Sequence, residues 1–86
     1  MKALVISKPK QFTKDKITPD KLKESKIMLQ KYIDDGIVEQ AYAIIGGGSV
    51  YVVNVKSLDE LKQGLQKNDL MKYSDVDIAT LEERTD

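Results

Sequence analysis

The chain has 86 residues, of which 41% are hydrophobic and 33% charged, and its formal net charge is zero. This composition predicts one soluble globular domain over residues 1–86, and no apolar stretch approaches the roughly 18 residues that span a membrane. The sequence has no cysteine and no histidine, which excludes disulfides, thiolate catalysis and the commonest zinc ligands, so we expect no metal site and no cofactor.

The first predicted element is a strand over residues 2–8, a short run rich in apolar and β-branched residues. Pro9 ends it, because proline has no backbone N–H to donate to a sheet. The run is too brief for the apolar region of a secretory signal, so we expect the protein to stay in the cytoplasm. Residues 10–17 are polar and lysine-rich without a sustained period, which predicts an exposed loop.

The first helix is expected over residues 19–35. Thr18 supplies the N-cap, Pro19 takes the first helical position, and Gly36 adopts the left-handed conformation that ends a helix. Apolar side chains at helical spacing predict a buried stripe. The stripe consists of Leu22, Leu29, Tyr32 and Ile33, widened by Ile27 and Met28.

Three consecutive glycines, Gly46 to Gly48, separate two predicted strands over residues 38–45 and 49–55. A glycine loop that cradles a phosphate presents its amides at the start of a following helix, usually with a Lys-Ser or Lys-Thr pair. Here a β-branched strand follows and that pair is missing. The glycines therefore predict a tight hairpin turn, since glycine tolerates the positive φ angles that such turns need.

Ser57 and Glu60 form a capping box, which predicts the start of a second helix that ends near Asn68. Gly64 weakens this helix by about 1 kcal/mol relative to alanine, which indicates a close neighbour that needs the space. The buried stripe of the helix is expected from Leu58, Leu61 and Leu65.

A last strand is expected over residues 73–81, where Val76 and Ile78 alternate with polar side chains, and residues 82–86 form a frayed tail. The element order is then βαββαβ. This is the ferredoxin-like pattern of an α+β domain, in which two helices cover one face of a four-stranded antiparallel sheet. A domain of this size gains buried surface by oligomerising, so we expect at least a dimer.

Alternation along the strands assigns side chains to the two faces of this sheet. The side chains expected under the helices are Leu4, Ile6, Ala41, Ala43, Tyr51, Val53, Val55, Val76 and Ile78. The opposite face then carries Ala3, Val5, Ser7, Gln40, Tyr42, Val50, Val52, Asn54, Asp75 and Asp77. This second face mixes an apolar patch with a few polar groups, which predicts that a second protomer covers it and encloses a pocket.

Four segments carry a resemblance to a known family: "ALVIS", "AIIGGG", "VYVVNVKSLDELKQGL" and "LMKYSDVDIATL". In their order and spacing, over nearly the whole chain, the sequence resembles the muconolactone isomerase family. The resemblance implies a dimeric α/β barrel, often in larger rings, and the cofactor-free movement of a double bond within a lactone by proton transfer. It also implies that Asp75 and Asp77 match the acidic pair of the family's last strand. Where the family's second strand carries His, Trp and Arg, this chain has Gln40, Tyr42 and Ala43.

The candidate catalytic residues are Asp75 and Asp77. Removing a proton next to a carbonyl needs a base within hydrogen-bond reach and a donor that stabilises the enolate. The two aspartates lie two residues apart on a strand and so share a face, where cover by a partner would favour the protonated form of one of them. The candidate substrate-binding residues are Gln40, Tyr42, Asn54 and Ser7.

Other interpretations of these residues remain open. The aspartates also fit a solvated edge that keeps the last strand from aggregating, and Tyr42 also fits as aromatic filler at a protomer interface. The chain as a whole fits either a small enzyme acting on a hydrophobic acid or lactone, or a non-catalytic oligomeric domain that binds a small molecule or only associates. The lysine-rich first half, with nine Lys against five Asp or Glu in residues 1–36, fits solvated lysines on a helix face, and it also fits a positive potential that attracts a carboxylate ligand.

Nucleic acid is the third candidate partner, because RNA-recognition modules share the βαββαβ order. Those modules stack bases on aromatic residues of the two central strands. Here "ALVIS" has no aromatic residue, "GGSVYVVNV" has one, and the net charge is zero. We therefore expect neither a nucleic acid nor a membrane as partner.

Overall fold

The computed structural model describes residues 1–11 and 16–84, so part of the predicted 10–17 loop and the end of the predicted tail lie outside the described residues. The elements in chain order are β1 (Lys2–Pro9), α1 (Pro19–Asp34), β2 (Val38–Ala43), β3 (Ser49–Asn54), α2 (Leu58–Gln66), the short 3-10 helix η2 (Asp69–Tyr73) and β4 (Ser74–Leu81). The predicted βαββαβ order is confirmed, with η2 added between α2 and β4.

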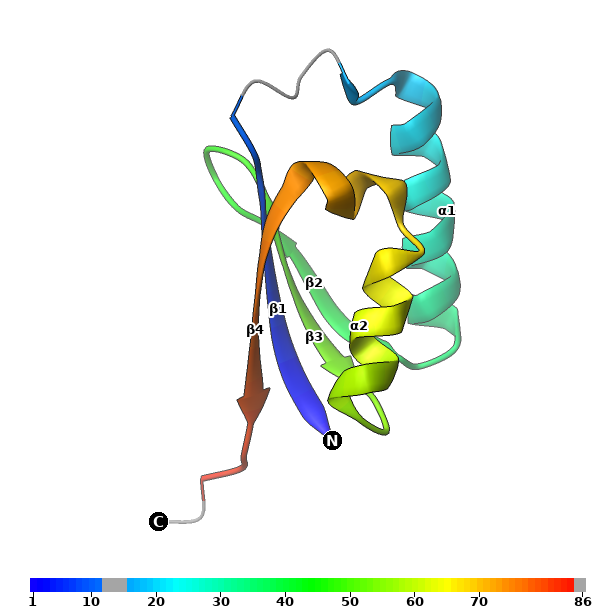
Figure 1. The fold of residues 1–86 in the computed structure, drawn as a ribbon. Helices are drawn as coiled ribbons and strands as arrows, with labels where there is room; N and C mark the ends of the chain where they lie inside the picture. Colours follow the sequence, from blue (N-terminus) through cyan, green and yellow to red (C-terminus); the bar gives the residue numbers. More distant parts are fainter. Residues whose placement is uncertain (12–15, 85–86) are drawn as a thin grey trace.

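The four strands form one antiparallel sheet in the order β2-β3-β1-β4. Both helices lie on the same side of this sheet (Figure 1). The predicted α+β ferredoxin-like fold is thereby confirmed. We call the side of the sheet away from the helices the open face.

Both helices begin at the predicted caps. The Thr18 hydroxyl accepts a hydrogen bond from the backbone N–H of Lys21 at 3.2 Å, and the Ser57 hydroxyl accepts one from Glu60 at the same distance. The Glu60 carboxylate in turn accepts from the backbone N–H of Lys56 at 3.2 Å. These side chains satisfy backbone donors that have no partner within the helix, which is why each helix starts where it does.

The glycine loop is a hairpin turn, as predicted. The φ angles of Gly46, Gly47 and Gly48 are 98°, 122° and 99°, a region that side chains disfavour. The loop closes through hydrogen bonds from Ile44 N–H to the Gly48 carbonyl at 2.9 Å and from Gly47 N–H to the Ile44 carbonyl at 3.0 Å. The next element is strand β3 and not a helix, so the glycine amides do not form the helix-end arrangement that binds phosphate.

The prediction of which side chains face the helices was wrong for β1 and right for the other three strands. Ala3 and Val5 are buried under the helices, opposite Val53 and Tyr51 of β3, so Leu4 and Ile6 lie on the open face. The sequence could not decide this, because β1 is apolar at every position from Ala3 to Ile6 and a one-residue slip exchanges the two faces. The pairing of β1 with β3 decides which side of the sheet each side chain of β1 occupies.

The hydrophobic core is small. Among the described residues, the buried hydrophobic side chains are Ala3, Val5, Val38, Val53, Val55 and Leu61. Helix α1, which is described throughout, has no buried residue, although Leu29 and Tyr32 pack partly against the core. The predicted stripe was too wide, because Leu22, Ile27 and Ile33 are exposed. Helix α1 therefore covers the sheet with a narrow contact.

Candidate functional site

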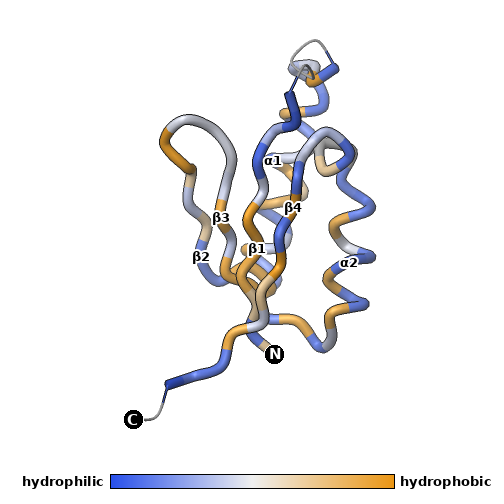
Figure 2. Tube along the Cα trace, turned by 60° about the vertical axis from the view of Figure 1, so that its left-hand side comes forward, coloured by the Kyte–Doolittle hydropathy of each residue, from blue (hydrophilic) through white to orange (hydrophobic). Residues whose placement is uncertain are grey.

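The open face has an apolar centre between polar edges. Residues opposite one another in an antiparallel sheet point to the same side, so the register defines rows across the four strands. One row consists of Tyr42, Val50, Ile6 and Asp77, and the next consists of Gln40, Val52, Leu4 and Ala79. Hydrophobic residues run along the two central strands, β1 and β3 (Figure 2). The middle of each row is thus apolar and partly exposed, and three of the four row ends are polar.

The register places five of the six predicted site residues on this face, but it does not bring them together within one protomer. Asp75 and Asp77 are exposed on the edge strand β4, and Gln40 and Tyr42 are exposed on the opposite edge strand β2. Three strand spacings of roughly 4.8 Å separate the two edges by about 14 Å. A single protomer therefore does not place an aspartate within hydrogen-bond reach of Tyr42.

Asp75 lies beside a lysine on the neighbouring strand. It is opposite Lys8 in the register between β4 and β1, and both residues are exposed. Opposite charges at such positions attract one another across the strands. This arrangement also fits the alternative in which the aspartates form a solvated edge.

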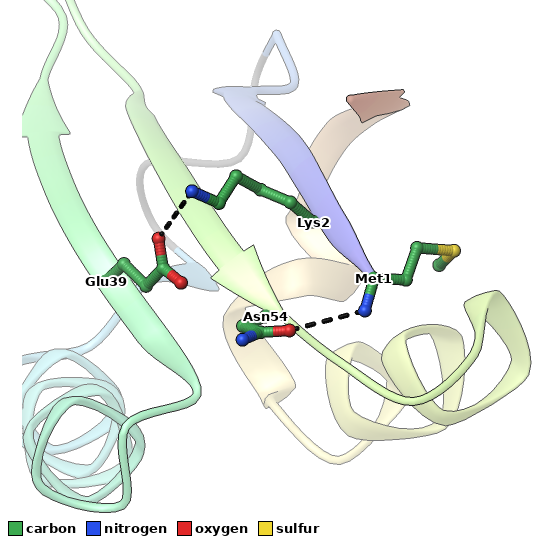
Figure 3. A network of polar contacts seen from close by, with 4 residues as sticks. All are labelled: Met1, Lys2, Glu39 and Asn54. Atoms are coloured by element: carbon green, nitrogen blue, oxygen red, sulfur yellow. Dashed lines mark hydrogen bonds and ion pairs between the residues drawn. The ribbon is translucent and has the colours of Figure 1, made fainter. Parts of the chain in front are cut away.

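Asn54 has a structural partner in the described chain. Its side-chain oxygen accepts a hydrogen bond at 3.3 Å from the amino group of Met1 (Figure 3). The same amino group donates to the Val55 carbonyl at 2.8 Å. Nearby, the Lys2 ammonium forms an ion pair of 3.2 Å with the Glu39 carboxylate. Asn54 therefore fixes the start of β1 at one end of the open face, an interaction between residues far apart in sequence that strand periodicity could not predict.

Ser7 lies on the other side of the sheet, so the prediction that it shares a face with the other candidates was wrong. Only 7% of it is exposed, and its hydroxyl donates to the sulfur of Met71 at 3.8 Å. The physical reason is the register of β1 described above, which turns Ala3, Val5 and Ser7 together toward the helices. Ser7 is a core hydroxyl and takes no part in a site on the open face.

A cavity of about 250 Å³ lies between the helices and the sheet. Its walls are mainly apolar and come from both helices and from strands β1, β2 and β3. The sequence does not reveal this cavity, because a helical stripe predicts burial and not how closely the helix approaches the sheet. Gly64 lines this cavity on α2, and a Cβ there would meet nothing nearer than the Tyr32 hydroxyl at 3.9 Å, so the prediction of a close neighbour that needs the space was wrong.

Two kinds of feature are absent from the described residues. No group of three or more His, Cys, Asp or Glu side chains within residues 1–11 and 16–84 is arranged to hold a metal ion. No helix in the described part of the chain is long and apolar enough to cross a membrane. Searches against protein-family models and against curated proteins found no match.

Proposed function

We propose that the chain is a homo-oligomeric, cofactor-free isomerase similar to the muconolactone isomerases, acting in the cytoplasm on a small hydrophobic acid or lactone. In this proposal a second copy covers the open face and the substrate lies between the two sheets. The row of Tyr42, Val50, Ile6 and Asp77 supports it best, because an apolar centre would hold the substrate body between polar groups at the two edges.

The symmetry of a dimer would bring those edges together. In an isologous pair with its two-fold axis parallel to the strands, β4 lies over β2 of the other copy, with the sheets about 10 Å apart. Asp77 then comes opposite Tyr42 of the partner subunit. With the axis perpendicular to the strands, β4 would instead lie over its own copy and bring like charges together, which is unfavourable. The parallel axis therefore gives a site with an acid and a hydroxyl donor.

The proposed reaction moves one proton. The Asp77 carboxylate removes a proton from a carbon next to the substrate carbonyl, and Tyr42 of the partner subunit donates a hydrogen bond to the enolate oxygen that forms. The Asp77 carboxyl then returns the proton to the far carbon of the conjugated system, so that the double bond shifts and no atom is gained or lost.

A non-catalytic association domain is the second candidate. The exposure of Asp75 and Asp77 and the position of Asp75 opposite Lys8 favour it. In that case the apolar rows of two copies pack directly on one another and leave no room for a ligand.

The test is deuterium exchange of β,γ-unsaturated lactones and acids in heavy water, followed by NMR. The isomerase proposal predicts enzyme-dependent exchange that falls at least about a hundredfold in Asp77→Asn, within the range that general base catalysis contributes. Glu82→Gln, an exposed acid just beyond β4, is the matched control and should keep the wild-type rate. A dimer without any exchange across the panel would support the association domain instead.

A further inference from the structure

The cavity between the helical layer and the sheet is independent of the open face. The sheet separates the two, and the cavity is lined by core residues such as Val5 and Val53 on the strands, Leu29 and Tyr32 on α1, and Leu61 and Leu65 on α2. A second hollow of about 500 Å³ beside α2 shares Leu65, Asn68 and Met71 with it. The cavity is therefore closed toward the sheet and can be reached along α2.

Helix α1 is linked to its neighbours by polar contacts as well as by the partly buried Leu29 and Tyr32. On α1, the Ser25 hydroxyl accepts a hydrogen bond from the Asn68 side-chain amide at 3.2 Å, and the Lys21 ammonium donates one to the Tyr73 hydroxyl at 3.3 Å. These contacts attach α1 to the segment after α2, and the cavity lies between α1, α2 and the sheet. Atoms that line an unfilled space lose dispersion contacts, which a molecule of matching shape restores.

The lining indicates the chemistry of such a molecule. Among the described residues, no side-chain nitrogen or oxygen that is fully shielded from solvent lacks a hydrogen-bond partner. The charged lining residues, Glu60 and Lys67, are exposed at the rim. Aromatic rings line the cavity from two sides, Tyr32 from α1 and Tyr51 from β3, and aromatic pairs gain energy beyond their buried area.

We propose that this cavity binds a neutral aromatic molecule of one or two rings. An engineered apolar cavity of roughly 150 Å³ is enough to bind benzene, and the volume here is larger. The ligand differs in charge from the carboxylate proposed for the open face, and it occupies the other side of the sheet. An experiment can therefore contradict one of the two proposals without contradicting the other.

The probe is toluene, titrated into the isotope-labelled full chain and followed by NMR, with benzoate as the charged comparison. We expect saturable toluene binding, with the largest shifts at Tyr32, Val53 and Leu65, and at least tenfold weaker binding of benzoate. Gly64→Leu adds an apolar side chain inside the cavity and should weaken toluene binding at least tenfold. Lys23→Leu makes the same addition on the exposed side of α1, outside both hollows, and should leave toluene binding unchanged.

Three results would overturn the proposal: no saturable toluene shift, shifts confined to open-face residues such as Leu4 and Val52, or benzoate binding as tight as toluene. Unchanged toluene affinity in a folded Gly64→Leu chain would do the same. If that variant does not fold, the wild-type shift map decides alone, because the cavity residues and the open-face residues lie on opposite sides of the sheet.

Discussion

A Cβ atom on Gly48 would overlap the backbone carbonyl oxygen of Ser7. Gly47, its neighbour in the same turn, has open space where a Cβ would lie, although its φ of 122° is also unfavourable for a side chain. Glycine is therefore favoured at position 47 only by the backbone angle. At position 48 it is favoured by the backbone angle and also by the close approach of β1.

This difference gives the first prediction. Gly47→Ala should lower the free energy of unfolding by about 1 kcal/mol, and Gly48→Ala should lower it by clearly more, because the backbone of β1 must shift as well. Urea denaturation of both variants measures the difference. Equal losses would show that the approach of Ser7 does not constrain the turn. Neither the open face nor the cavity includes Gly47, so Gly47→Ala should leave any ligand affinity unchanged.

Gly64 and Gly36 give the second prediction, with opposite signs. Gly64 lies inside α2, and a Cβ there would meet nothing nearer than the Tyr32 hydroxyl at 3.9 Å, an ordinary contact. Gly64→Ala should therefore raise the free energy of unfolding by about 1 kcal/mol. Gly36 follows α1 with a φ of 78°, so Gly36→Ala should lower it by about 1 kcal/mol. Thermal unfolding followed by circular dichroism measures both, and a loss in Gly64→Ala would contradict the open space seen beside α2.

The sequence predicted those features that depend on local pattern. The caps at Thr18 and Ser57, the hairpin glycines and the element order follow from residues close together in the chain, and all were confirmed. The face of β1 was predicted wrongly because its run is apolar throughout, and only pairing with β3 fixes the phase. The partner of Asn54 is 53 residues away, beyond the reach of any periodicity.

Asn54 gives the third prediction. If it serves only to fix Met1, Asn54→Ala should lower the free energy of unfolding by at most about 1 kcal/mol, because the hydrogen bond is exposed. Asn54→Asp keeps an acceptor for the amino group and should recover that stability. A substrate-binding role would give a different result, since Asn54→Ala would then weaken ligand binding on the open face without changing stability. Denaturation and ligand titration of the same two variants distinguish these roles.

The last prediction concerns the association of two copies. Ile6 lies in the centre of the open face, flanked by Val50 and Asp77 in its row, so a second sheet packed on that face would bury it. Ile6→Lys places a charge in the middle of that interface, where no partner is available to neutralise it. In one protomer Ile6 is only partly buried, so we expect the variant to keep its secondary structure.

Sedimentation at micromolar concentration should therefore find a dimer or larger species for the wild type and a folded monomer for Ile6→Lys. Ile45→Lys is the matched control, because Ile45 is fully exposed at the tip of the hairpin and lies outside the rows of the open face. It introduces the same charge and should leave the assembly intact. If the wild type were a monomer, no second sheet would cover the open face, and the proposed isomerase site could not form. Dissociation by Ile45→Lys but not by Ile6→Lys would instead assign the interface to the hairpin tip, since only side chains buried between the copies oppose the addition of a charge.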